Sequence, residues 1–189
     1  MVQLHALRTL FRYAGRVIPA LRRVWNRKTR AGILLLAIVV SVPAFAQGTI
    51  LTRTDTQKLL PASVYYKGQS APTQLRNSGG VKFSDGSYVL ATLVDNSGYS
   101  SDVAAKYQGY FISEAPLKIG GQDLPAGIYG FGFIAGDKFV ITDVGGHDVL
   151  TASSSSDDAM KRPVPLQVTA DAGGGYRLYS GRKYVTFNK

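Results

Sequence analysis

The chain has 189 residues, with 22 Lys and Arg against 12 Asp and Glu, and it has no cysteine. This length suits one domain, and the lack of cysteine excludes disulfides, thiolate metal sites and a thiol nucleophile. Residues 1–46 hold eight of the bases and none of the acids, so the rest of the chain has 14 bases against 12 acids. The formal charge of +10 therefore belongs mainly to the first segment, and a nucleic-acid partner is not expected for the remainder.

The first segment has the three parts of a secretory signal. A basic, acid-free region precedes the apolar run AGILLLAIVVSVPAFA of residues 31–46, in which Ala44 and Ala46 occupy the positions that a signal peptidase reads. We predict that residues 1–46 are a cleaved signal sequence and that Gln47 begins the mature chain. Residues 47–189 are then a single domain, exported to the periplasm or the extracellular space, and membrane contact is expected only through the leader.

Other interpretations of the first segment stay open. An uncleaved membrane anchor needs about 20 apolar residues, and Ser41 and Pro43 interrupt a shorter run here. Residues 1–30 repeat apolar side chains every three or four positions, as a basic amphipathic helix on an anionic membrane does. A misassigned start codon explains the same residues, and an Arg-rich, acid-free start is shared with organelle transit peptides, although the Ala-Phe-Ala ending favours bacterial export.

Residues 47–189 contain short apolar runs with alternating side chains, separated by Gly, Asn, Asp and Ser. Such runs predict strands, and glycine or Asx residues between them predict hairpins. The predicted strands cover residues 63–67, 81–83, 87–94, 107–113, 128–134, 138–142, 164–170, 176–180 and 183–187. One helical turn is expected at 102–107 and a mobile surface loop at 152–165. The predicted fold is all-β, an antiparallel β-sandwich or a small barrel built from sequential hairpins.

The strand predicted at 128–134 has the clearest pattern. Tyr129, Phe131 and Phe133 lie on one side, and the other side carries Gly130 and Gly132. Apolar residues on both sides predict a central strand, and the two glycines leave a groove that a neighbouring ring can cover. Because aromatic side chains also bind apolar ligands and stack on sugars, the three aromatic residues are candidate ligand-binding residues.

A resemblance appears just before this strand. Residues 121–129 read GQDLPAGIY, which resembles the G-x-x-L-P-A-G-x-Y hairpin of exported bacterial β-domains of unknown function, of a kind common in acidobacterial secreted proteins. The similarity covers about a dozen residues. It implies a secreted β-sandwich, and it implies no catalytic residue.

The loop DVGGHD offers the candidate chemistry. Asp143, His147 and Asp148 are candidates for a metal site, and Asp143 is placed to orient His147 as a general base. The alternative is a polar hairpin loop rich in turn-forming residues. A G-x-S-x-G elbow, a P-loop and paired glutamates are all missing from the sequence, and no cofactor is expected.

These observations favour a non-enzymatic exported domain that binds an unknown envelope component or protein, or that has a structural role in the envelope. One alternative is a hydrolase or metal-dependent enzyme that uses Asp143, His147 and Asp148. A second alternative is a small outer-membrane β-barrel, although the predicted strands are short for membrane strands of about 10 residues. The sequence leaves open the ligand, the oligomeric state and the choice between sandwich and barrel.

Overall fold

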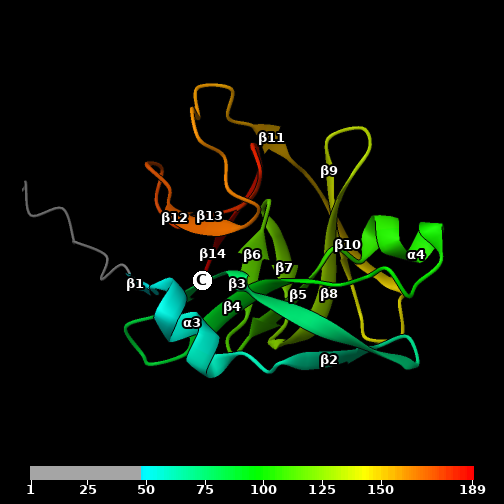
Figure 1. Ribbon diagram of the computed structural model, residues 1–189. Helices are drawn as coiled ribbons and strands as arrows, with labels where there is room; N and C mark the ends of the chain where they lie inside the picture. Colours follow the sequence, from blue (N-terminus) through cyan, green and yellow to red (C-terminus); the bar gives the residue numbers. More distant parts are fainter. Residues whose placement is uncertain (1–47) are drawn as a thin grey trace, which may run out of the picture. The chain divides into compact units, whose positions relative to one another are not determined.

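Two antiparallel β-sheets and two short helices form the part of the chain that this computed structural model describes, residues 48–189 (Figure 1). The sheets are separate and are not closed into a barrel. The all-β prediction is therefore confirmed, and of the two architectures left open by the sequence the protein has the sandwich. The predicted signal sequence, the amphipathic pattern within it and the cleavage site at Ala44, Ala46 and Gln47 lie outside the described residues.

The larger sheet has eight strands in the order β1-β3-β4-β5-β8-β9-β10, and β2 pairs with β3. Its strands are β1 (Thr49–Ile50), β2 (Ser63–Tyr66), β3 (Gln69–Lys82), β4 (Tyr88–Val94), β5 (Gly109–Ser113), β8 (Gly127–Ile134), β9 (Lys138–Thr142) and β10 (Asp148–Ser153). Strands β3, β4 and β5 pair antiparallel in chain order, and so do β8, β9 and β10, as the sequence predicts.

The smaller sheet has six strands in the order β12-β13-β14-β6-β7, and β11 pairs with β14. Its strands are β6 (Leu117–Ile119), β7 (Gln122–Leu124), β11 (Ser155–Ser156), β12 (Gln167–Ala170), β13 (Tyr176–Ser180) and β14 (Lys183–Asn188). The hairpin β6-β7 therefore leaves the larger sheet after β5, and the chain returns to it at β8.

The main core lies between the two sheets. Phe111 of β5 meets Phe187 of β14 edge to face, with ring centroids 6.4 Å apart, and both rings are buried. Fully burying one such side chain contributes about 1.5–3 kcal/mol. Because the sequence has no cysteine, packing of this kind and the backbone hydrogen bonds hold the sandwich together.

A second, smaller core covers the outer face of the larger sheet. We call β2 together with residues 69–74 of β3 the arm, because this hairpin folds over that face. The ring of Tyr66 in the arm is stacked on that of Tyr107, and the hydroxyl of Tyr99 donates to the Tyr66 carbonyl oxygen at 2.9 Å. The backbone N–H of Lys67 at the tip of the arm donates to the Val144 carbonyl oxygen at 2.8 Å. The arm is therefore fastened at both its face and its tip.

The central strand β8 shows how its two faces are used. Its inward side chains Tyr129, Phe131 and Phe133 are 8%, 0% and 8% exposed, since they pack in the main core. On the outer face, a Cβ atom at Gly130 would lie 2.8 Å from the rings of both Tyr66 and Tyr107. The groove predicted from the glycines is therefore filled by rings from the arm and from the segment before β5.

Two helices of seven and six residues join these strands: α3 (Arg53–Leu59) and α4 (Ser101–Lys106). The second confirms the predicted helical turn, whereas the first was not predicted. Its start is fixed by a reciprocal cap in which the Thr52 side chain accepts from the Asp55 N–H and Asp55 accepts from the Thr52 N–H. Within residues 48–189, no helix has the length and apolar character that crossing a membrane requires.

Two further regions differ from the sequence prediction. Strand β3 begins at Gln69, twelve residues before the predicted start, because its first half pairs with β2 in the arm. The predicted loop at 152–165 contains the end of β10 and the short strand β11, and the Ser154 N–H donates to the Asp137 carbonyl oxygen at 2.8 Å. In both regions the backbone is paired with segments that are distant in the sequence, and a local sequence pattern does not reveal such pairing.

Candidate functional site

The strand β3 is interrupted where it passes from the arm into the larger sheet. Its pairing with β4 runs from Gln74 opposite Leu93 directly to Ser78 opposite Thr92. The three residues between, 75–77, therefore have no partner on β4 and form a large bulge. Bulges of this kind turn a strand and redirect its side chains, and here the bulge separates the arm from the sheet.

Short polar contacts hold the bulge in place. The Ser78 hydroxyl donates to the Leu75 carbonyl oxygen at 2.6 Å and lies 2.7 Å from the Thr56 hydroxyl of α3. The amide nitrogen of Asn77 donates to the amide oxygen of Gln74 at 2.9 Å. The bulge is thus fixed by its own side chains and by the helix that packs against it, which gives it a defined shape.

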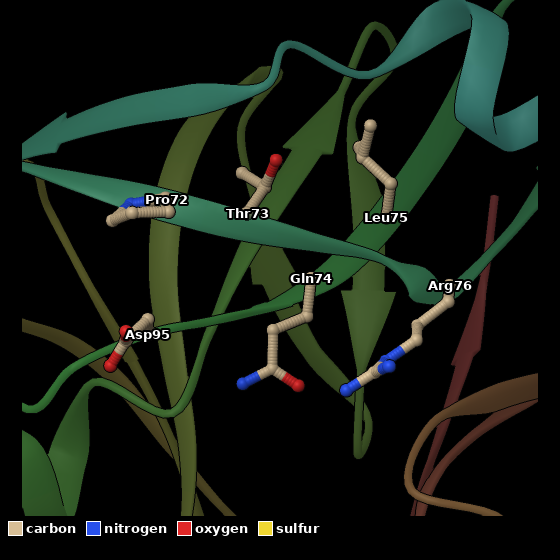
Figure 2. Close-up of a pocket in the computed structure, with 6 residues that line it drawn as sticks. All are labelled: Pro72, Thr73, Gln74, Leu75, Arg76 and Asp95. Carbon is tan, nitrogen blue, oxygen red and sulfur yellow. The ribbon is translucent and has the colours of Figure 1, made fainter.

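A hollow of about 500 Å³ lies beside the bulge. It is lined by Pro72, Thr73, Gln74, Leu75, Arg76 and Asp95. In Figure 2, the side chains of Gln74 and Arg76 point to the side of β3 on which Asp95, the residue after β4, also lies, and Thr73 and Leu75 point the other way. Its volume falls in the range of about 300–1,000 Å³ that is common for small-molecule sites.

The hollow brings together one cation, one anion and one amide. Arg76 and Asp95 are both exposed, and within residues 48–189 neither forms an ion pair. Hydrogen bonds from the Ser97 side chain and backbone hold the pKa of Asp95 below its usual range. The amide nitrogen of Gln74 donates to the Val94 carbonyl oxygen at 3.3 Å, which places the amide between the two charges.

The residues predicted as catalytic or metal-binding lie elsewhere, in the turn between β9 and β10. Nδ1 of His147 is 2.9 Å from Oδ2 of Asp143, and Oδ1 of Asp143 accepts from the His147 N–H at 2.9 Å. Those hydrogen bonds from the backbone and side chain of His147 lower the pKa of Asp143. The structure thus brings Asp143 and His147 together. They lie in a polar hairpin loop, which the sequence analysis gave as the alternative to a metal or general-base site.

Asp148 does not join that pair. Its carboxylate forms an ion pair with Lys106 of α4 at 2.6 Å. Among the described residues, no group of three or more His, Cys, Asp or Glu side chains is arranged to hold a metal ion. The polar residues of this loop therefore close a turn and join β10 to α4.

The predicted ligand-binding residues Tyr129, Phe131 and Phe133 lie in the main core, facing the smaller sheet. Sequence reasoning missed the hollow, because residues 68–80, which include most of its lining, were not predicted to form a strand. The available signal was Pro72 and Asn77 inside an otherwise strand-like stretch, since proline and asparagine mark strand edges and irregularities.

The fold and the site define an all-β sandwich with a polar hollow at a strand bulge. Comparisons with protein-family models, with curated proteins and with solved structures return no match. The resemblance of residues 121–129 to exported bacterial β-domains stays a prediction. In the structure these residues cover β7 and the start of β8.

Proposed function

We propose that residues 47–189 act as an exported, non-enzymatic domain of the bacterial cell envelope that binds a partner in the hollow beside the β3 bulge. The observation that carries this proposal is that Arg76 and Asp95 lie at one hollow and are not paired within the described residues. Charged side chains that serve only solubility are usually scattered, whereas a binding site gathers a few oriented polar groups in a concave place. The leader pattern supports export to the periplasm or beyond.

The arrangement of the polar groups favours binding over catalysis. The alternative enzyme would use His147 as a general base, and a base must be within hydrogen-bond reach of a nucleophile or substrate proton. The ring of His147 contacts only Asp143 among the hydrogen bonds of residues 48–189, and its side chain is 83% exposed.

Export and binding are tested on the same protein. The full chain is expressed in a bacterial host, and the mass of the protein recovered from the envelope fraction is measured. A chain that begins at Gln47 supports export with cleavage. A chain that still carries Met1 and remains in the cytoplasm contradicts it.

The recovered protein is then mixed with isolated cell-wall sacculi and centrifuged. We expect the wild type to sediment with the sacculi and Arg76→Gln to stay largely in solution, with Arg182→Gln as the matched control at an exposed residue that does not line the hollow. If all three proteins stay in solution, binding to the cell wall is contradicted. If Arg76→Gln sediments like the control, a role for the hollow in this binding is contradicted.

A further inference from the structure

The hollow beside the β3 bulge has the chemistry to select a particular class of ligand. We propose, building on the proposed function, that it binds a short peptide with free amino and carboxyl termini, of about the size of a dipeptide. The carboxylate would pair with Arg76, the ammonium with Asp95, and the peptide group between them with Gln74.

The acidic end of the hollow is fixed. The Asp95 N–H donates to the Pro72 carbonyl oxygen at 2.9 Å, and Oδ1 of Asp95 accepts from the Ser97 N–H at 3.1 Å. Those bonds orient the carboxylate and leave Oδ2 free of backbone partners in the described part of the chain. A fixed, ionised carboxylate is a suitable partner for an ammonium group.

The basic end of the hollow comes from the bulge. Arg76 is the middle of the three residues without a partner on β4, and the neighbouring contacts of Asn77 and Ser78 hold its backbone. A guanidinium group binds a carboxylate through two parallel hydrogen bonds, which a lysine cannot reproduce. This end is therefore suited to a terminal carboxylate.

The middle of the hollow matches a peptide group. Gln74 uses one N–H on the Val94 carbonyl oxygen and one lone pair on Asn77, so a second N–H and a second lone pair remain. A peptide bond offers one acceptor and one donor to such an amide. The pyrrolidine ring of Pro72 adds an apolar wall for a small side chain. The order of ammonium, amide and carboxylate in a dipeptide is the order of Asp95, Gln74 and Arg76 along the hollow in Figure 2.

Three probes test this assignment by calorimetric titration of the protein recovered from cells that express the full chain. Alanyl-alanine carries both charges, its N-acetyl derivative lacks the ammonium, and its C-terminal amide lacks the carboxylate. We expect each blocked probe to bind about 5- to 10-fold more weakly than the free dipeptide, a loss of about 1–1.4 kcal/mol. Equal affinity for the three probes, or no binding of alanyl-alanine at about 10 mM, would overturn the proposal.

Two variants assign the ends. Arg76→Gln should bind the free dipeptide and its amide equally, while still discriminating against the acetylated probe. Asp95→Asn should show the reverse pattern. The controls are Arg182→Gln and Asp102→Asn, which replace exposed residues that do not line the hollow, and both should discriminate as the wild type does. Thermal transitions equal to that of the wild type show that the variants are folded, and variants that discriminate like the controls contradict the assignment.

The outcomes separate the ligand from the wider function. Sedimentation with sacculi without selection among the probes would contradict the dipeptide and keep an envelope role. Selection among the probes without sedimentation would keep the dipeptide site and contradict binding to the cell wall. An internal peptide segment that binds as tightly as a free dipeptide would also contradict the requirement for free termini.

Discussion

The rings of Tyr66 and Tyr107 lie 3.7 Å apart at their centroids and within 6° of parallel. Tyr66 belongs to the arm and Tyr107 to the segment that joins α4 to β5, so this contact fastens the arm to the outer face of the larger sheet. The two hydroxyl groups differ. The hydroxyl of Tyr66 is 2.8 Å from the Thr142 hydroxyl, whereas that of Tyr107 is buried and has no hydrogen-bond partner within residues 48–189.

Removing the Tyr66 hydroxyl should destabilise the protein. Tyr66→Phe deletes the hydrogen bond and leaves the fully buried Thr142 hydroxyl without that partner. We expect the free energy of unfolding to fall by about 1–2 kcal/mol, measured by urea denaturation. Tyr65→Phe is the control, because Tyr65 is 63% exposed, and it should change the stability by less than about 0.5 kcal/mol. Equal effects of the two substitutions would contradict the role of this bond.

Removing the Tyr107 hydroxyl should have the opposite effect. A buried hydroxyl without a partner costs free energy, and burial also raises the pKa of this phenol by disfavouring its charged form. Tyr107→Phe keeps the stacked ring, so the free energy of unfolding should rise by about 1 kcal/mol in the same urea assay. A loss of more than about 1 kcal/mol would mean that the hydroxyl has a partner, such as a buried water.

Much of the fold follows from local patterns in the sequence. The two faces of β8 and the hairpin at Gly136 and Asp137 were predicted, because side-chain alternation and positive-φ residues are encoded in a few neighbouring positions. The helix α3 had a local signal, the pair Thr52 and Asp55, but its seven residues are too few to show a helical repeat. The strands β6, β7 and β11 have two or three residues each, so their pairing partners define them.

The candidate site depends on distant residues and could not be predicted in the same way. The bulge exists because β3 slips against β4, and that register is set by pairing across the sheet. Arg76 and Asp95 come together only because β4 returns along β3, passes the bulge and ends opposite Thr73. The loop at Asp143 and His147, by contrast, is a local turn, and the sequence suggested both its hairpin and its possible chemistry.

Adding a side chain at Gly132 of β8 should destabilise the protein. A Cβ atom there would lie 2.5 Å from the Lys106 carbonyl oxygen at the end of α4. Gly132→Ala should therefore push α4 from the sheet, lower the free energy of unfolding by about 1–3 kcal/mol and speed amide exchange in α4.

Gly98→Ala is the matched control for that substitution, since its nearest neighbour in the described structure would be 3.8 Å away. It should be neutral or stabilising by up to about 1 kcal/mol, because alanine restricts the unfolded chain. If Gly132→Ala behaves like this control, the close packing of α4 on β8 is contradicted.

Asp85 should make part of the stability depend on pH. Its carboxylate accepts hydrogen bonds from Lys189 Nζ, from the Ser87 hydroxyl at 2.7 Å and from the Ser87 N–H at 3.1 Å, and these bonds lower its pKa well below the ordinary value of 3.8. A carboxyl group whose pKa is lower in the folded protein stabilises it fully above the unfolded-state pKa. That contribution declines as the pH falls below about 4 and is lost once the pH is below the folded-state pKa.

We therefore expect wild type to exceed Asp85→Asn in unfolding free energy by a constant amount between about pH 5 and 7, and by less at about pH 3. Lys189→Met removes one of the three donors, so the wild type should exceed this variant in unfolding free energy by a smaller amount over the same pH range. If the difference between the wild type and Asp85→Asn is unchanged at about pH 3, this carboxylate is not stabilised by folding.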